Sequence, residues 1–321
     1  MRKLLLITTG GTIACGDTSD GRTPIGGNSA QPLLERLDFV PSDCVISTVS
    51  PFSLDSTDMT PDNWVCVAGI IREKYNDYDG FVVTHGTDTL AYAASALSCL
   101  IQNSTKPVVL TGSMLPMLTY GTDAKENLQN ALAFACDERT HGVTVVFQKW
   151  AYDGRRVSKV HTVEKNAFES VNYPPIAYFD NCGINFAESV CEANGECEVQ
   201  FFDALDKCVE AVYLVPGVVP QTVAKATKAV VVMGFGVGGI PCGCMEWLEE
   251  LVSRGVYVIM STQVLRGGTD LSLYEVGSRI ISRYPVLCSG KMTVEYALVR
   301  TMWALAYSND YDSFKKLFCG E

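Results

Sequence analysis

Hydroxyl side chains gather where the apolar segments of the N-terminal half end. The first such segment, "LLLITTGGTIACG" at residues 4–16, contains two glycines that are followed at once by Thr12. Similar clusters occur at "LDSTDMT" (54–60), at "HGTDT" (85–89) and at Gly112-Ser113. A threonine hydroxyl is a weak nucleophile unless a positioned base takes its proton. Because the clusters also contain Asp55, Asp58 and Asp88, they predict a hydroxyl-rich pocket with carboxylates, and they lack the glycine cradle and lysine of a phosphate site.

Each cluster taken alone also fits a purely structural role. Ser, Thr and Asp are the preferred N-cap residues of helices, and a helix is predicted directly after each cluster. Capping is the favoured interpretation for "DSTD", and in "GTDT" either Asp88 or Thr87 could cap a helix that starts at Thr89. Their shared location favours function, because all of them fall at the carboxyl edge of one predicted parallel sheet, where ligands bind.

The elements that must position these residues alternate along the chain as short β-branched and longer amphipathic segments, which indicates βα units. The predicted strands are Lys3–Thr9, Cys44–Val49, Gly80–Thr84, Pro107–Thr111 and Val143–Gln148. The predicted helices lie near Pro32–Leu37, Pro61–Tyr75, Thr89–Asn103 and Asp123–Cys136. Thr60 before Pro61 is a typical helix start, and residues 151–185 follow the looser pattern of loops or a hairpin.

A polar stretch, "ESVCEANGECEVQ", divides the chain and carries the turn signal Asn194-Gly195. We therefore predict an N-terminal α/β catalytic domain over 1–190, a linker over 191–210 and a smaller C-terminal α/β domain over 211–321. The expected C-terminal strands are Ala211–Val215, Ala229–Met233 and Val256–Ser261. The expected C-terminal helices are Gln221–Thr227, Met245–Ser253, Thr293–Tyr307 and Tyr311–Phe318.

Composition limits the partners. The net charge of −11, with no basic block, disfavours nucleic acid and anionic membranes. We expect no secretory signal, and no run of about 18 apolar residues that would span a membrane occurs in the sequence. Thirteen cysteines without a Cys-x-x-Cys motif, beside three histidines, disfavour a metal site and are typical of a protein of the reducing cytoplasm.

Two other kinds of chemistry are disfavoured. Gly234, Gly236 and Gly239 match G-x-G-x-x-G, but Pro241 delays the helix and no carboxylate follows the next strand, so a nicotinamide site is unsupported. These glycines are expected to form a tight loop at a domain or subunit contact. No G-x-S-x-G elbow is present, and His85 is expected to be a hydrogen-bonded core residue.

Three motifs, "TTGGTIA", "HGTDT" and "GRRVSK", resemble the bacterial-type L-asparaginases in order and spacing. "SLDSTDMTPDNW", "DYDGFVVTHGTDTLAYAASAL" and "MTVEYALV" resemble the cytoplasmic type I branch, and the resemblance runs from Lys3 to the final helices. It implies a two-domain α/β asparaginase-like fold with a mostly parallel N-terminal sheet. It also implies hydrolysis of L-asparagine to L-aspartate and ammonia through an acyl-enzyme, without metal or cofactor.

The resemblance also assigns roles to the clusters. It implies that Thr12 is the nucleophile and that Thr87, Asp88 and Lys159 activate it. A lysine can act as a base only when its amine is neutral, which burial favours and a neighbouring carboxylate opposes. The implied substrate-binding residues are Ser56, Thr57 and Asp58 for the α-amino and α-carboxylate groups, together with Gly11, Gly86 and Ser113. Backbone N–H groups near Gly11 and Thr87 would form an oxyanion hole.

One segment departs from the family pattern. Residues 15–28 should form the mobile lid, and "DGRTPIGG" places Arg22 or Thr23 where much of the family has a tyrosine. The sequence leaves open whether Thr23, a residue from elsewhere or a greater contribution of Lys159 replaces it. The family also implies a homodimer or homotetramer in which C-terminal residues near "LRGGTDLSLYE" complete a neighbour's pocket, and some type I enzymes carry a second, regulatory asparagine site.

Other functions share these motifs. The amidase-like subunit of an archaeal-type tRNA amidotransferase carries an extra N-terminal domain, whereas this sequence begins just before its first predicted strand, which disfavours it. A non-catalytic asparagine-binding regulatory protein would bind asparagine and release no ammonia. Glutamine differs from asparagine by one methylene, worth about 1–3 kcal/mol of discrimination, so the sequence leaves a weaker glutaminase activity open.

Overall fold

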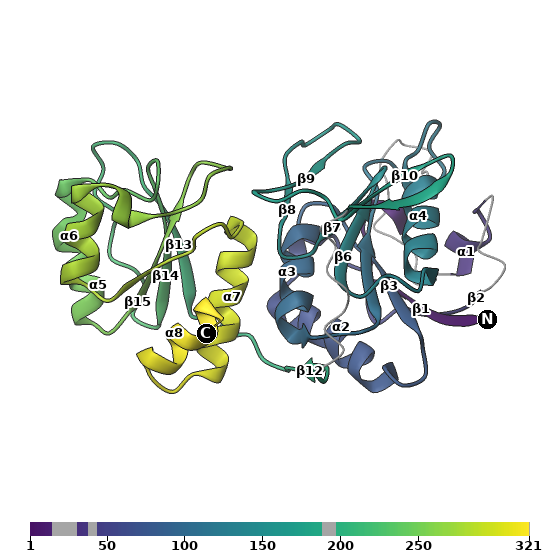
Figure 1. Ribbon diagram of the computed structural model, residues 1–321, viewed down its shortest axis with the longest axis horizontal. Coiled ribbons are helices and arrows are strands. Elements are labelled where there is room, and N and C mark those ends of the chain that lie inside the picture. The colour runs from purple at the N-terminus through teal and green to yellow at the C-terminus, as the bar shows by residue number, and fades with distance from the viewer. Residues whose placement is uncertain (15–30, 38–43, 188–196, 321) are drawn as a thin grey trace. The chain divides into compact units, whose positions relative to one another are not determined.

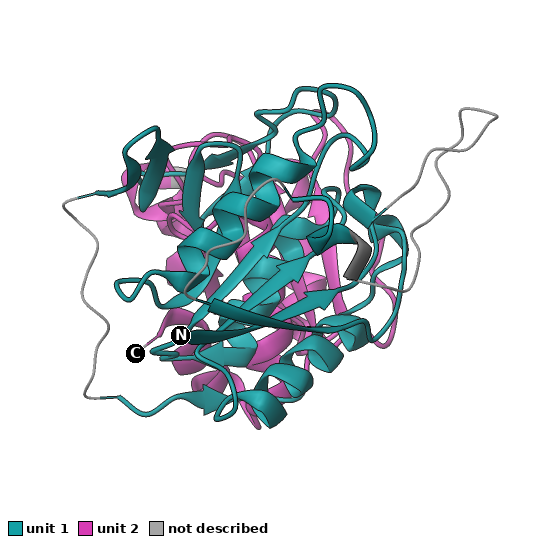
Figure 2. Ribbon diagram, turned by 90° about the vertical axis from the view of Figure 1, so that its right-hand side faces the viewer, with its two compact units in different colours: residues 1–203 teal, residues 204–321 magenta. Residues whose placement is uncertain are grey.

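The computed structural model describes residues 1–14, 31–37, 44–187 and 197–320. Its contacts divide the chain into two compact units, Met1–Asp203 and Ala204–Glu321, which Figure 2 colours separately. Residues 191–196 of the predicted linker lie outside the described residues, as do lid residues 15–28 with Arg22 and Thr23.

The first unit is built on one eight-stranded sheet in the order β11-β10-β7-β6-β5-β3-β1-β2. Its five parallel strands are those predicted: β1 (Arg2–Thr8), β2 (Cys44–Val49), β3 (Gly80–Thr84), β5 (Pro107–Thr111) and β6 (Gly142–Phe147). Three antiparallel strands extend the sheet: β7 (Trp150–Asp153), β10 (Ala177–Asp180) and β11 (Gly183–Phe186). The sheet is thus mostly parallel, as expected, and β10–β11 is one of two hairpins in the loosely patterned region.

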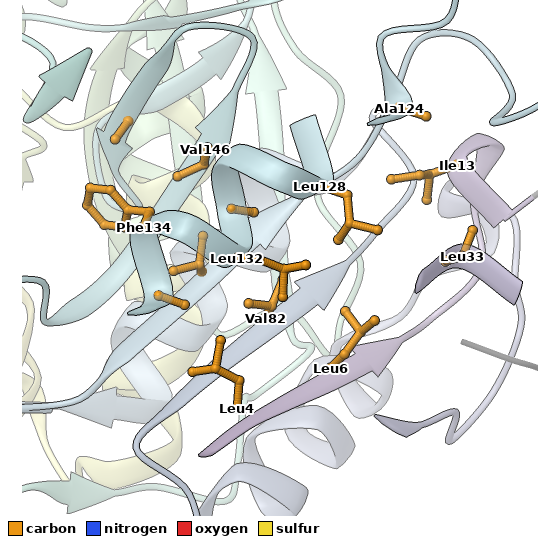
Figure 3. Packing of buried hydrophobic residues seen from close by; sticks show 14 of the residues in the cluster. Leu4, Leu6, Ile13, Leu33, Val82, Ala124, Leu128, Leu132, Phe134 and Val146 are labelled. Atoms are coloured by element: carbon orange, nitrogen blue, oxygen red, sulfur yellow. The ribbon is translucent and has the colours of Figure 1, made fainter. Parts of the chain in front are cut away.

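Helices cover both faces of this sheet (Figure 1), which explains why every residue of β3 and β5 is buried. Helix α4 (Ala124–Cys136) covers one face, while α2 (Pro61–Lys74) and α3 (Leu90–Leu100) lie on the other. On the α4 face, alternate strand residues pack against the helix (Figure 3); they include Leu4, Leu6, Val82 and Val109 opposite Leu128 and Leu132. The short helix α1 (Gln31–Leu34) adds Leu33 to this core.

Two small pairs of strands complete the unit. β4 (Ile101–Gln102) pairs with β12 (Gln200–Phe201), and β8 (Val157–Lys159) pairs with β9 (Phe168–Ser170). The β8–β9 hairpin is fastened to the main sheet by aromatic side chains. The Tyr152 hydroxyl donates to the Phe168 carbonyl at 3.0 Å, and the Phe147 and Phe168 ring centroids lie 4.8 Å apart. This anchoring fixes the strand that ends at Lys159.

The second unit is a parallel four-stranded sheet in the order β13 (Val209–Tyr213), β14 (Ala229–Gly234), β15 (Tyr257–Thr262), β16 (Val286–Cys288). Its core contains α5 (Met245–Ser253) and α6 (Glu275–Arg283), which pack Trp247, Leu248 and Ile280 on one face of the sheet. Helix α7 (Val294–Tyr307) contacts β13, β14 and β15, and α8 (Tyr311–Cys319) packs against α7.

The predicted helix Gln221–Thr227 is wrong. These residues form a turn and irregular backbone, because side chains from other elements bind their backbone groups. Glu210 accepts the Ala224 N–H at 2.9 Å, Arg254 donates to the Ala224 carbonyl at 2.9 Å, and Trp247 Nε1 donates to the Gln221 carbonyl at 3.2 Å. So short a helix is marginal on its own, and these tertiary hydrogen bonds decide against it. The elements α6 and β16 were not predicted.

The glycine-rich segment after β14 forms a tight loop, as expected. Phe235 and Gly239 exchange both backbone hydrogen bonds, at 2.9 and 2.7 Å, so the loop closes on itself. A 3-10 turn (Cys242–Cys244) intervenes before α5 begins at Met245. A pyrophosphate site requires a helix that begins inside the glycine loop, and here the helix begins only after it.

In the part of the chain that the structure describes, no helix is both long and apolar enough to cross a membrane.

Candidate active site

The strand order places a topological switch point between β1 and β3. From β1 the chain moves to β2 on one side, and it then crosses back to β3 on the other side. Ligands of open α/β sheets bind outside the carboxyl ends of the strands at such a point. The loops that follow β1 and β3 carry Thr12 and "HGTDT".

Backbone hydrogen bonds tie the loops at this edge together. The Gly11 N–H donates to the Leu54 carbonyl at 3.1 Å, and the Leu54 N–H donates to the Thr9 carbonyl at 3.0 Å. On the other side of β1, the Thr9 hydroxyl donates to the Thr84 carbonyl at 2.9 Å. Segments far apart in the sequence therefore meet in one layer above the sheet.

Two glycines allow these loops to approach closely. A Cβ on Gly11, whose φ is +79°, would lie 2.5 Å from both Cα and N of Gly86. A Cβ on Gly86 would lie 2.6 Å from the Cβ of Ser56. Only glycine fits at either position. This contact brings the backbone beside Thr12 against the backbone beside Thr87, and Thr12 itself, at the start of a 3-10 turn (Thr12–Ala14), is half-buried.

Lys159 joins the two central residues of "HGTDT". Its Nζ lies 2.9 Å from Thr87 Oγ1 and 2.6 Å from Asp88 Oδ1. The lysine side chain is only 16% exposed, whereas the Asp88 side chain is 57% exposed. Thr87 is buried beneath them. The structure thus brings together three of the four residues assigned to catalysis, and it places the fourth, Thr12, next to Gly11 at the contact with Gly86.

The capping interpretation of "GTDT" is wrong. Helix α3 begins at Leu90, its N-cap residue is Thr89, and no side chain caps it. The Thr89 hydroxyl donates instead to the Ser56 carbonyl at 2.7 Å, a link between the loops after β2 and β3 that was not predicted. Because Lys159 engages both Thr87 and Asp88, neither side chain serves the helix end.

The capping interpretation of "DSTD" is confirmed for Asp55. Its carboxylate accepts the Thr57 N–H and the Thr57 hydroxyl, both at 2.8 Å, at the start of a 3-10 turn (Ser56–Asp58). These two hydrogen bonds lower the pKa of the Asp55 carboxyl below its usual value. Buried Ser56 lies toward the site, since its Oγ accepts the Asp88 N–H at 3.3 Å, whereas Thr57 and Asp58 are exposed.

The loop after β5 reaches Thr87 through Gly112. A Cβ on Gly112 would lie 2.4 Å from the His85 carbonyl oxygen and 3.5 Å from Thr87 Cγ2. Ser113 is buried and its hydroxyl donates within its own loop, to the Leu115 carbonyl at 2.6 Å. The Ser113 side chain is therefore committed to its loop.

His85 is a buried, hydrogen-bonded residue, as expected. Its backbone N–H donates to the Thr111 carbonyl at 2.8 Å, and its ring Nδ1 lies 2.8 Å from the Gly86 carbonyl oxygen. Burial lowers the pKa of His85 to about 4, so the imidazole is neutral near pH 7 and Nδ1 donates to the carbonyl. This histidine supports the turn.

Among residues 1–14, 31–37, 44–187 and 197–320, no group of three or more His, Cys, Asp or Glu side chains is placed to hold a metal ion. The arrangement is instead one of hydroxyls, a lysine and a carboxylate, which suits nucleophilic attack by an activated hydroxyl.

Comparison with known proteins agrees with this chemistry. Residues 3–191 match the family described as Asparaginase, N-terminal, and residues 208–318 match the Glutaminase/Asparaginase C-terminal domain. The L-asparaginase of Thermococcus kodakarensis is 42% identical over 322 residues, which cover 98% of this chain and 96% of that protein. A solved structure of the thermostable L-asparaginase from Thermococcus kodakarensis has a TM-score of 0.91 at 41% identity, covering 98% of this chain and 96% of that chain.

Two further relatives differ in how much of their own length this chain covers. L-asparaginase 1 of Escherichia coli K12 is 32% identical over 325 residues, covering 98% of this chain and 95% of that protein. A glutamyl-tRNA(Gln) amidotransferase subunit of Pyrococcus furiosus is 32% identical over 329 residues, covering 98% of this chain and 74% of that protein.

Proposed function

Because this chain belongs to the asparaginase family, we propose that it is an L-asparaginase, which hydrolyses the side-chain amide of L-asparagine to L-aspartate and ammonia. The observation that carries the proposal is the cluster of Lys159, Thr87 and Asp88 beside the Gly11–Gly86 contact. The similarity to the Thermococcus and Escherichia L-asparaginases over nearly their whole lengths supports the same substrate.

Thr12 is the nucleophile in this mechanism. Its Oγ1 adds to the amide carbon, its proton passes to a base, and the amide nitrogen leaves as ammonia once it has gained a proton, which leaves an aspartyl ester on Thr12. Water then attacks the ester, takes the place of Thr12 and releases aspartate. The hydrogen bond from Lys159 Nζ occupies a lone pair of Thr87 Oγ1. For the transfer, the lone pair of a neutral Lys159 amine takes the Thr87 hydroxyl proton while Thr87 Oγ1 takes the proton of Thr12.

Asp88 and Lys159 share one charge-assisted contact. When a neutral Lys159 amine accepts the proton that comes from Thr12, the Asp88 carboxylate stabilises the ammonium that forms. When the proton is returned to the leaving nitrogen, the same carboxylate keeps the amine within reach of Thr87. The pair therefore acts as one proton-holding unit.

The N–H groups of Thr12 and Thr87 are the oxyanion-hole donors in this proposal. The Gly11 N–H is already engaged by the Leu54 carbonyl. The close contact between Gly11 and Gly86 sets the two following N–H groups on neighbouring turns. Two backbone donors aimed at one developing negative charge are the usual arrangement in acyl transfer.

Ser56, Asp58 and Asp88 hold the α-groups of the substrate. Ser56 Oγ accepts the Asp88 N–H, so its own proton can be donated to the α-carboxylate. Asp58 and Asp88 are exposed carboxylates suited to the α-ammonium group. The Thr57 hydroxyl is held by Asp55, so its part in binding is to fix the turn that presents Ser56.

The decisive experiment is ammonia release from L-asparagine by the purified protein, with Thr12→Ala and Thr87→Val measured alongside. Turnover should be lost in both variants while circular dichroism shows an unchanged fold. With a slow substrate, intact-mass measurement should locate the adduct on Thr12. Near-normal turnover in Thr12→Ala would refute the assigned nucleophile.

A tRNA amidotransferase component is the second candidate, favoured by the similarity to the Pyrococcus furiosus protein. Initial rates with asparagine and glutamine across concentration separate the two, because an asparaginase should prefer asparagine without tRNA or a second protein. The same curves report any glutaminase activity and any sigmoidal response. Asparagine binding without ammonia release would instead indicate a regulatory protein.

Assembly and location form part of the proposal. We expect a homodimer or homotetramer, which light scattering after size exclusion would detect. None of the eleven cysteines that the structure describes forms a disulfide. Thiols in this number suit the reducing cytoplasm, where cell fractionation should find the protein.

A further inference from the structure

Two polar side chains are buried at the start of α4, the helix that covers one face of the main sheet. Asp123 is 2% exposed and Asn127, one turn later, is 0% exposed. Burying a carboxylate and an amide costs free energy unless hydrogen bonds replace their water. An apolar side chain such as leucine would fill the core without this cost. What the hydrogen bonds of Asp123 and Asn127 hold in place therefore needs an explanation.

These hydrogen bonds hold one loop. Asp123 accepts the Met114 N–H at 2.9 Å, the Leu115 N–H at 3.0 Å and Asn127 Nδ2 at 3.0 Å. Asn127 Nδ2 also donates to the Gly112 carbonyl at 2.9 Å. On its other side, Asn127 Oδ1 accepts the N–H of Gln148, the residue after β6, at 2.8 Å. The pair thus ties residues 112–115 to α4 and to the end of β6.

The loop held in this way lies beside the Thr87 side chain. A Cβ built on Gly112 would touch the Thr87 methyl group, at 3.5 Å from Cγ2. A threonine side chain has three staggered χ1 rotamers. They differ in the directions in which the methyl group and the hydroxyl group point. The methyl group thus lies on the Gly112 side of Thr87, while Oγ1 is directed to Lys159 Nζ at 2.9 Å. The position of the backbone at Gly112 therefore bears on which Thr87 rotamer is occupied.

The far end of the same loop is fastened to the hairpin that carries Lys159. Lys165, in the turn between β8 and β9, donates from Nζ to the Gly121 carbonyl at 2.5 Å. The Thr122 hydroxyl donates back to the Leu115 carbonyl at 3.2 Å. The segment from Gly112 to Thr122 thus lies beside Thr87 at one end and is hydrogen-bonded to the lysine hairpin at the other.

We propose that Asn127 and Asp123 are positioning residues for the reaction: they hold the 112–115 loop so that Gly112 locks Thr87 in the rotamer that faces Lys159. This inference rests on the proposed function for its kinetic consequences. Neither residue touches the reacting atoms, so their effect should be on kcat and not on substrate binding.

The kinetic test compares Asn127→Leu with Asn130→Leu. Asn130 is a matched control, because it lies on the same helix and donates to the backbone of the same Gln148, at 2.9 Å, without reaching the 112–115 loop. Asn127→Leu should lower kcat about tenfold, the factor that the loss of one oriented hydrogen bond gives, and leave KM within about threefold. Asn130→Leu should leave both nearly unchanged. An equal loss of kcat in the two variants would overturn the proposal.

A double-mutant cycle with Thr87→Ser tests whether Asn127 acts through the Thr87 methyl group. Serine lacks the methyl group through which Gly112 acts, so Asn127→Leu should have less than about a threefold effect in that background. The same tenfold loss in both backgrounds would show that Asn127 does not act through Thr87. Gly112→Ala shifts the loop without changing the helix, because its Cβ would lie 2.4 Å from the His85 carbonyl oxygen. Unchanged kcat in this variant would also overturn the proposal.

A measurement without turnover separates this inference from the proposed function. In protein labelled at threonine methyl groups, the Thr87 methyl signal should report one fixed χ1 in the wild type and averaging in Asn127→Leu. Absence of asparagine hydrolysis by the wild type would refute the function and leave this test standing. An unchanged Thr87 signal in Asn127→Leu would refute the positioning role, whatever the protein hydrolyses.

Discussion

Adding one methyl group at Gly11 should nearly abolish turnover while the fold survives. The Cβ of an alanine there would lie 2.5 Å from Cα and N of Gly86, whereas ordinary contacts of a Cβ begin near 3.4 Å. The two turns must therefore move apart by close to 1 Å. Since Gly86 precedes Thr87 and Gly11 precedes Thr12, this shift separates the nucleophile from the group that activates it. A misplacement of this size costs about 10²-fold in rate.

The left-handed backbone at Gly11 adds conformational strain in the alanine variant. This strain must be separated from the effect of the steric clash with Gly86. At φ +79°, an alanine is disfavoured by about 1–2 kcal/mol whatever surrounds it. Gly142 supplies the control, because its φ is +66° and nothing lies within 4 Å of its Cβ position. Gly142→Ala therefore carries the backbone cost alone.

The assay is ammonia release from asparagine at saturating concentration, together with urea unfolding of both variants. Gly142→Ala should lose about 1–2 kcal/mol of stability and keep its kcat. Gly11→Ala should lose at least as much stability and about 10²-fold in kcat. Equal kcat values for the two variants, once both are shown to be folded, would refute the argument that the contact between residues 11 and 86 sets the site.

Other changes probe the cluster, the core and the fold. Lys159→Met removes the hydrogen bond to Thr87 and should lower kcat by about 10²–10⁴-fold, with asparagine binding retained in calorimetry. His85 is neutral in the fold with a pKa of about 4, against 6.5 when unfolded, so the unfolded chain binds the extra proton between these pH values. Stability should therefore fall from pH 6.5 down to pH 4 by about 3 kcal/mol, and urea unfolding of His85→Gln should show a flatter pH dependence. Lys106→Met should lower stability by about 1–3 kcal/mol without changing kcat, because Nζ donates to the Tyr75 and Tyr78 carbonyls at the end of α2. A melting temperature equal to that of the wild type would contradict this last expectation.

Local sequence was enough to predict much of the molecule. The five parallel strands of the first unit follow from short apolar segments, and the start of α2 follows from Thr60-Pro61. The sequence also singled out the two glycines after β1, and one of them, Gly11, makes the close contact with Gly86. These features were accessible because the hydrophobic period and the turn chemistry are properties of neighbouring residues.

Predictions were less reliable for residues whose structure depends on a hydrogen-bond partner far away in the sequence. Asp88 and Thr87 had the composition of a helix cap, yet they contact Lys159, which follows Thr87 by 72 positions. Residues 221–227 had a helical pattern, yet Glu210, Trp247 and Arg254 take their backbone groups. In both cases long-range hydrogen bonds outweighed a local preference, which for a helix cap is about 1 kcal/mol.

Residue types and their spacing were sufficient to identify the side chains that could do chemistry and the edge of the sheet where they would lie. Which of these side chains meet depends on the folded chain: Lys159 with Thr87, Ser56 with Thr89, and Asn127 with Gly112. Asn127 has no motif of its own, because nothing in its local sequence distinguishes a buried amide from an exposed one. A helix or turn is selected by neighbours in the chain, whereas a hydrogen bond across the fold depends on how distant segments pack.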